Sequence, residues 1–138
     1  MGLKMDMTYV IKPGIVYIHS KYHRDNSYDK SQWTISEPEE RNCFKLMLDL
    51  SWYANQIGWG LHLVSGHVEY LGLSRYRRRP LFIAKFVDGT GEDVWHGYPA
   101  DHIWNDIPSH IVLRNWREKG LISAAKVRKI LRGQICDP

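Results

Sequence analysis

Residues 36–58, SEPEERNCFKLMLDLSWYANQIG, contain the strongest secondary-structure pattern in the chain. Ser36 and Glu39 have the spacing of a capping box, in which each side chain accepts a hydrogen bond from the backbone N–H of the other residue. Pro38 falls in the first turn, where its missing N–H is not needed. Downstream, apolar residues recur at helical spacing, at Cys43, Met47, Leu50, Ala54 and Ile57. The pattern predicts an amphipathic helix that ends at Gly58.

A tight β-hairpin is predicted directly after this helix. Trp59–Val64 and His67–Leu71 read as strands, and Ser65-Gly66 between them reads as a two-residue turn. This turn length fixes the cross-strand pairs as Val64 with His67, Leu63 with Val68, His62 with Glu69, and Leu61 with Tyr70. Because side chains alternate between the two faces of a strand, one face is apolar and the other carries His62, His67 and Glu69.

Further strands are predicted on both sides of this hairpin. Pro80–Val87 and Glu92–His96 flank a Gly-rich loop and form a second hairpin. Gly14–His19 is a short β-like run near the N-terminus, and the polar residues 20–32 after it indicate a long loop.

Two short helices are predicted at the C-terminal end, at about residues 108–119 and 123–132. Pro108 opens the first of them and Gly120 closes it, while Ser123 caps the second and Gly133 closes it. The predicted fold class is α+β: one long amphipathic helix packed on an antiparallel sheet of two hairpins plus an N-terminal strand, with a C-terminal helical hairpin. Residues 1–138 are expected to form a single domain, with a partly irregular segment (1–35), a helix-and-sheet core (36–100) and the helical hairpin (106–133).

Positive charge is concentrated in the C-terminal helices. The whole chain has a net charge of +4, but residues 114–132 hold seven basic residues and one acidic residue. This distribution predicts a surface that contacts nucleic-acid phosphates, through Arg114, Arg117, Lys126, Arg128, Lys129 and Arg132. The segment resembles a helix-turn-helix, but its turn is one residue longer and Trp116 stands where a small residue is expected. The alternative is a solvated basic face.

A second basic segment joins the two predicted hairpins. Arginines beside a tyrosine suit phosphate contacts and base stacking on single strands, which makes Arg75, Arg77, Arg78 and Arg79 candidates for nucleic-acid binding. Trp95, Tyr98 and Trp104 are candidate recognition aromatics for a base or for a partner peptide. Their alternative role is to pack the C-terminal helices onto the sheet.

Two functions compete with phosphate binding. His62, His67 and Glu69 on one sheet face could serve as an acid–base set for RNA cleavage, and the expected architecture resembles that of several ribonuclease toxins. A protein-binding adaptor that works through residues 95–104 is the other alternative. The sequence thus favours a small basic accessory protein associated with RNA or DNA, and it leaves open whether the protein is an enzyme.

No cofactor or metal is expected. The chain has no phosphate-binding loop and no dinucleotide fingerprint, and His19 and His23 are not placed on one helix face. Residues 1–7 contain no export signal, and no stretch approaches the length of a membrane span. Cys43 and Cys136 do not form a disulfide framework, so the expected location is the cytoplasm.

Overall fold

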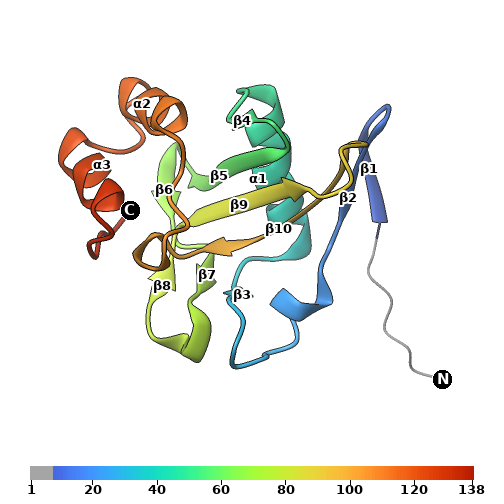
Figure 1. The fold of residues 1–138 in the computed structure, drawn as a ribbon, viewed down its shortest axis with the longest axis horizontal. Helices are drawn as coiled ribbons and strands as arrows, with labels where there is room; N and C mark the ends of the chain where they lie inside the picture. Colours follow the sequence, from blue (N-terminus) through green and yellow to red (C-terminus); the bar gives the residue numbers. More distant parts are fainter. Residues whose placement is uncertain (1–7) are drawn as a thin grey trace.

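A sheet of seven strands forms the middle of the protein in the computed structural model, which describes residues 8–138 (Figure 1). Its order is β1-β2-β10-β9-β5-β4, and β6 pairs with β5. All pairs are antiparallel except β2 with β10. The strands are β1 (Thr8–Lys12), β2 (Ile15–Ile18), β4 (Tyr53–Ala54), β5 (Ile57–Val64), β6 (His67–Glu69), β9 (Ile83–Asp88) and β10 (Val94–Ala100).

A second, three-stranded sheet lies beside the first. It has the order β3-β7-β8 and consists of β3 (Gln32–Trp33), β7 (Gly72–Leu73) and β8 (Pro80–Leu81). Three short 3-10 helices complete the connections, namely η1 (Lys21–His23), η2 (Arg75–Arg77) and η3 (His102–Trp104). The predicted long loop over residues 20–32 therefore contains η1 and the start of β3.

Helices cover both faces of the large sheet. The helix α1 (Glu37–Asp49) lies behind it in Figure 1, whereas α2 (His110–Glu118) and α3 (Ala124–Leu131) lie at upper left. The predicted α+β class, with a long helix on the sheet and a C-terminal helical hairpin, is confirmed. None of the helices within residues 8–138 combines the length and the apolar character that crossing a bilayer requires. The prediction about an export signal in residues 1–7 lies outside the described residues.

Two glycines of β5 let α1 approach the sheet closely. A Cβ atom on Gly58 would lie 2.3 Å from Sδ of Met47, and one on Gly60 would lie 3.3 Å from the backbone oxygen of Cys43. Four helical residues rise about 6 Å and two strand residues about 6.6 Å. Each step of four residues along α1 therefore matches a step of two residues along β5. Glu39, four residues before Cys43, accordingly lies next to His62, two residues after Gly60.

The predicted end of the first helix at Gly58 is wrong. The helix α1 ends at Asp49, and Ser51 has a left-handed φ of 57°. Asn55 and Gln56 both have positive φ, which suits the type I′ turn of a two-residue hairpin between β4 and β5. Ala54 and Ile57, assigned to the helix face by periodicity, pair across this hairpin.

The predicted register of the next hairpin is confirmed for three pairs, which are His62 with Glu69, Leu63 with Val68, and Val64 with His67. Ser65 and Gly66 both have positive φ, as a type I′ turn requires. The fourth predicted pair, Leu61 with Tyr70, does not form, because β6 ends at Glu69.

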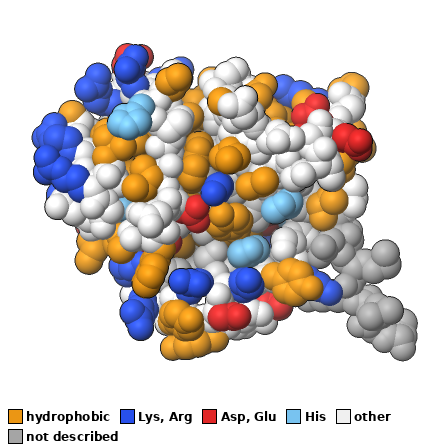
Figure 2. All heavy atoms as spheres, in the orientation of Figure 1, with side chains coloured by type: hydrophobic (Ala, Val, Ile, Leu, Met, Phe, Trp, Pro, Cys, Tyr) orange, Lys and Arg blue, Asp and Glu red, His pale blue; other side chains and the backbone are white. Residues whose placement is uncertain are grey.

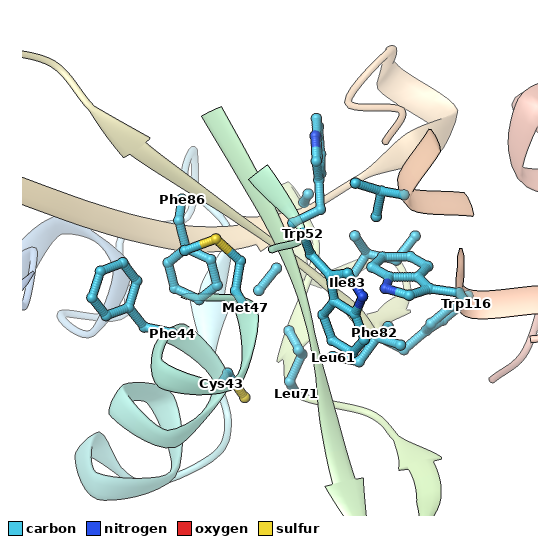
Figure 3. Close-up of a cluster of buried hydrophobic side chains, with 14 of the residues drawn as sticks. Cys43, Phe44, Met47, Trp52, Leu61, Leu71, Phe82, Ile83, Phe86 and Trp116 are labelled. Atoms are coloured by element: carbon cyan, nitrogen blue, oxygen red, sulfur yellow. The ribbon is translucent and has the colours of Figure 1, made fainter. Parts of the chain in front are cut away.

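Buried side chains occupy both faces of β5 (Figure 3). Figure 3 shows Cys43, Phe44, Met47 and Phe86 on the side of α1, and Trp52, Leu61, Ile83 and Trp116 on the other side. The rings of Trp52 and Trp116 meet edge to face with centroids 5.7 Å apart. Nε1 of Trp52 also donates to Oδ1 of Asn115 at 2.8 Å. The chain leaves α1 at Leu50 and crosses to the other side of β5 at Trp52.

A buried carboxylate ties β2 to α1. Glu40 is 1% exposed and accepts hydrogen bonds from Arg24, at 2.8 and 3.0 Å, and from the hydroxyl of Tyr17. Burial and the charge of Glu40 raise the pKa of Tyr17 well above its ordinary value, so the phenol stays protonated. Nδ1 of His19 lies 3.0 Å from Oε1 of Glu40 but makes no hydrogen bond to it. Nε2 of His19 lies 3.0 Å from Nη1 of Arg41.

Asp88 organises the loop of the β9–β10 hairpin. Its carboxylate accepts from the backbone N–H groups of Gly91, Asp93 and Val94 at 2.9 to 3.3 Å. Burial acts to raise the pKa of Asp88, but these hydrogen bonds outweigh it and hold that pKa below its ordinary value.

Asp88→Asn is expected to lower stability at pH 7 by about 1–3 kcal/mol, because the amide offers fewer acceptor sites to the three N–H groups. The folded pKa lies below the unfolded one, so the contribution of Asp88 is present at neutral pH and is lost as the pH falls through the folded pKa. Urea unfolding at several pH values measures this. The gap between wild type and variant should shrink on acidification, with Glu92→Gln in the same loop as control. A gap that does not change with pH would contradict this account.

The C-terminal helices begin and end near their predicted positions. The hydroxyl of Ser123 accepts from the N–H of Lys126, as a cap does. Gly120 and Gly133 follow the two helices with φ of 73° and 64°, the left-handed conformation that favours glycine after a helix. Both cysteines are free thiols; Cys43 is buried and Cys136 is half-buried.

Candidate nucleic-acid interface

The face of the large sheet opposite α1 carries a row of large side chains across three strands. Trp59 of β5 pairs with Lys85 of β9, and Lys85 pairs with Tyr98 of β10. The ammonium of Lys85 lies 5.3 Å from the ring centre of Trp59. The next row along the strands contains the exposed His96, paired with Val87. Aromatic and basic side chains thus alternate on this face.

A cleft of about 420 Å³ opens beside Tyr98. Its walls come from η1 and the residues after it, from the η2 loop, and from the segment that contains η3. The residues that line it include His23, Ser31, Arg75, Asp101, Trp104 and Asp106. Figure 2 shows His, basic and acidic side chains close together in the middle of this face. The cleft is therefore polar and mixed in charge.

His23 stands at one end of the cleft with a fixed orientation. Its ring stacks on the ring of Tyr98 with centroids 5.1 Å apart and 17° between the planes. Nδ1 lies 2.8 Å from the backbone oxygen of Ser31, which can only accept, so Nδ1 carries the proton. Burial lowers the pKa of His23 below its ordinary value, against the opposing effect of the Ser31 hydrogen bond. The imidazole is thus neutral at pH 7, with Nε2 unprotonated.

Lys85 and Asp106 form an ion pair at the hydroxyl end of Tyr98. Nζ of Lys85 donates to Oδ1 of Asp106 at 3.0 Å. Burial would lower the pKa of Lys85, but the hydrogen bond to Asp106 outweighs it and raises that pKa above its ordinary value. Burial and the charge of Asp106 raise the pKa of Tyr98, so its phenol is neutral as well. A charged ammonium group therefore lies close to a neutral phenol, beside the cleft that Tyr98 and Asp106 line.

Exposed aromatic and arginine side chains form a group that reaches the cleft at Arg75 and Trp104. We call Tyr28, Arg75, Tyr76, Arg77, Arg78 and Trp104 the arginine–aromatic rim. The guanidinium of Arg75 lies 5.7 Å from the ring centre of Tyr76 and 5.4 Å from that of Trp104. Arg77 lies 5.7 Å from the ring of Tyr28, and the rings of Tyr28 and Tyr76 are 5.2 Å apart. Trp104 is 61% exposed.

The backbone of the rim is held in an unfavourable conformation. Tyr76 and Arg77 have φ of 61° and 50°, which non-glycine residues rarely adopt. Hydrogen bonds maintain it: the N–H of Tyr76 donates to the oxygen of Tyr28 at 2.8 Å, and that of Arg77 to the oxygen of Ser74 at 2.9 Å. Strained backbone of this kind concentrates at functional sites. In this loop it points an aromatic side chain and its neighbouring arginines into solvent.

The structure places the predicted residues of this segment in three environments. Arg75, Arg77 and Arg78 are exposed in the rim, whereas Arg79 is paired with Asp101. Among the predicted recognition aromatics, Tyr98 and Trp104 line the cleft. Trp95 does not join them, because it is buried in the core against Phe44 and Tyr53.

The basic residues of the C-terminal helices lie apart from the rim. Figure 2 shows Lys and Arg side chains over α2 and α3 at upper left and a separate group along the lower edge. Arg114, Arg117, Arg128, Lys129 and Arg132 are exposed, and Lys126 is half-buried with its Nζ 2.8 Å from the oxygen of Pro138. Trp116 is the aromatic residue of these two helices, and it is fully buried. This surface can contact phosphates, but it exposes no Phe, Tyr or Trp ring for base stacking, and His110 is its one exposed aromatic ring within α2 and α3.

The predicted acid–base residues lie outside the cleft. His62 and Glu69 are paired across β5 and β6, as the sequence predicts, and His67 lies beside the turn. The ring of His62, however, points to the α1 side, where its Nε2 lies 3.4 Å from Oε2 of Glu39. His67 and Glu69 are exposed. Their assignment to RNA cleavage stays a prediction.

Several residues of the cleft were not singled out from the sequence. His23 was considered only as a metal ligand, and the part of the chain described here, residues 8–138, contains no group of three or more His, Cys, Asp or Glu side chains arranged for a metal. Lys85 and Asp106 are 21 residues apart, and no local pattern links them. Tyr28 carried a weak signal as an aromatic residue in a long polar loop.

Comparison with known protein families, with curated proteins and with solved structures found no match to this chain.

Proposed function

We propose that this protein binds single-stranded nucleic acid at the arginine–aromatic rim and the cleft behind it. The observation that carries the proposal is the rim itself, in which Arg75 and Arg77 lie 5.4 to 5.7 Å from exposed aromatic rings. Proteins that hold single strands without sequence preference combine stacking rings with cations that follow the backbone. Both elements alternate here within one loop and its neighbours.

Charge pairing also favours the rim. Within residues 8–138 no ion pair involves Arg75, Arg77 or Arg78, although Arg77 donates one hydrogen bond to the backbone oxygen of Asn26. Their guanidinium groups remain available for phosphate oxygens, which they match in geometry. The free thiols of Cys43 and Cys136 suit a reducing compartment, so the proposal places this activity in the cytoplasm.

Replacing Arg75, Arg77 and Arg78 together by alanine is expected to weaken binding of a single-stranded oligonucleotide about tenfold or more at 0.1 M salt. The slope of log affinity against log salt should fall by about 2, because each lost phosphate contact on a single strand removes about 0.7. Fluorescence anisotropy over a series of salt concentrations measures both quantities. Trp104→Ala should weaken binding with little change of this slope, because the side chain it removes carries no charge.

The matched control removes the same charge from the C-terminal helices, by replacing Arg128, Lys129 and Arg132 with alanine. If the rim binds the strand, this control keeps most of the affinity. Equal losses in both triple variants would mean that net charge rather than the rim governs binding. Failure of the wild type to bind single-stranded RNA or DNA at low salt would refute the proposed function.

A further inference from the structure

His23 has the features of a general base that nothing in its surroundings uses. Its Nδ1 proton is held by the oxygen of Ser31 at 2.8 Å, and no hydrogen bond within residues 8–138 engages its Nε2. The imidazole lines the cleft and stacks on Tyr98, which limits its rotation. A neutral imidazole with one nitrogen fixed and the other unprotonated can accept a proton from a bound hydroxyl group.

A proton donor lies close to the other end of the same tyrosine. Lys85 pairs with Tyr98 across the sheet, and its Nζ lies 3.0 Å from Asp106, which lines the cleft. The side chain of Lys85 is only 20% exposed, so its charge is weakly screened by solvent. Arg75 lines the same cleft and can hold the oxygens of a phosphate. A base and a guanidinium group thus line one cleft, and an ammonium group lies next to Asp106 of its wall.

We infer that the cleft cleaves RNA by transferring the phosphoryl group to the adjacent 2′-hydroxyl, with His23 as the base and Lys85 as the proton donor. Nε2 of His23 takes the 2′-hydroxyl proton while the 2′-oxygen forms a bond to phosphorus. The bond from phosphorus to the 5′-oxygen breaks, and this oxygen keeps the electron pair and takes a proton from Nζ of Lys85. The products are a 2′,3′-cyclic phosphate and a 5′-hydroxyl, and water then restores both protonation states.

The direction of each proton transfer agrees with the structure. The leaving 5′-alkoxide is a far stronger base than an amine, so Lys85 can protonate it even though Asp106 raises the pKa of that amine. Arg75 would stabilise the negative charge that develops on the non-bridging oxygens. This inference rests on the proposed function, because the rim has to deliver the strand, and it narrows the substrate to RNA, which alone carries the 2′-hydroxyl.

The test uses a labelled single-stranded RNA and its DNA counterpart with wild-type protein and His23→Asn. The asparagine amide can keep the hydrogen bond to Ser31 while it removes the base. We expect cleavage of RNA but not of DNA, a 2′,3′-cyclic phosphate at the new end, and a loss of about 100-fold or more in His23→Asn with unchanged RNA affinity. His110→Asn, at the exposed start of α2, is the matched control and should cleave at the wild-type rate.

Lys85→Met tests the role of the proton donor independently of the base His23. Its cleavage rate should also fall, and an RNA with sulfur in place of the 5′-bridging oxygen should restore it, because a leaving thiolate needs no proton. His23→Asn should not be rescued by this substrate. Wild-type protein that binds RNA but leaves it intact, or equal cleavage by His23→Asn, would overturn the inference and leave the proposed function standing. Absence of RNA binding would overturn both.

Discussion

Glu40→Ala is expected to lower the free energy of unfolding by about 3–5 kcal/mol, as does the loss of one partner of a buried ion pair. Glu40 is 1% exposed and accepts from Arg24 and from the hydroxyl of Tyr17. Removal of the carboxylate leaves the buried phenol of Tyr17 without its acceptor, and it takes from Arg24 the ion pair that the guanidinium makes with Glu40. A domain of this size has a total stability of about 5–15 kcal/mol, so the variant should lose a large part of it.

Urea unfolding followed by circular dichroism at pH 7 measures this loss. Glu40→Gln keeps the shape and one acceptor oxygen, so it should lose less, about 1–3 kcal/mol. Glu37→Ala, in the same first turn of α1 but only half-buried, is the control and should change stability by less than about 1 kcal/mol. A loss below about 1 kcal/mol in Glu40→Ala would show that the network does not hold β2 to α1.

Trp116→Ala should lower the free energy of unfolding by about 3–5 kcal/mol, in the range of large-to-small substitutions in a core. The indole is fully buried and packs edge to face on Trp52 at 5.7 Å. Trp52 also donates a hydrogen bond to Asn115 of α2, so the contacts of Trp52 with α2 join the C-terminal helices to the sheet. Truncation leaves a cavity at that junction, and amide exchange in α2 and α3 should accelerate more than exchange in β9.

Trp116→Phe tests whether the stabilisation comes from packing of the aromatic ring or from the indole N–H. Nε1 of Trp116 has no hydrogen-bond partner within residues 8–138, so phenylalanine gives up no bond made there and keeps much of the packing. We expect a loss of about 1–2 kcal/mol. Chemical denaturation compares the two variants. Equal losses, or exchange that accelerates evenly through the protein, would contradict the role of Trp116 as the contact that docks the helices.

The candidate site was only partly predictable from the sequence. The arginines at positions 75, 77 and 78 were recognisable because they are consecutive or nearly so in a loop with a tyrosine. Their aromatic partners were not, since Tyr28 lies in another loop and Trp104 comes from η3. Trp95 was assigned to recognition by its neighbours in sequence, yet strand alternation turns it to the α1 side. The side that each strand presents to a helix depends on which elements pack there.

The features that can be predicted from the amino-acid sequence alone are local interactions. The capping box of Ser36 and Glu39, the turn at Ser65-Gly66 with its register, and the glycine that ends α2 each depend on residues within a few positions of one another. They depend little on the rest of the fold, because both partners of each contact are close in the chain, so the pattern is sufficient to predict them.

Tertiary packing decided the rest. Periodicity extended the first helix to Gly58, but Trp52 is buried in the opposite layer, and the turn at Asn55 and Gln56 starts a strand instead. The parallel pairing of β2 with β10, the carboxylate of Glu40 and the cleft lined by His23 and Asp106 join residues far apart in the chain. Such contacts form only when the whole core closes, because the burial that stabilises them is shared by all the elements.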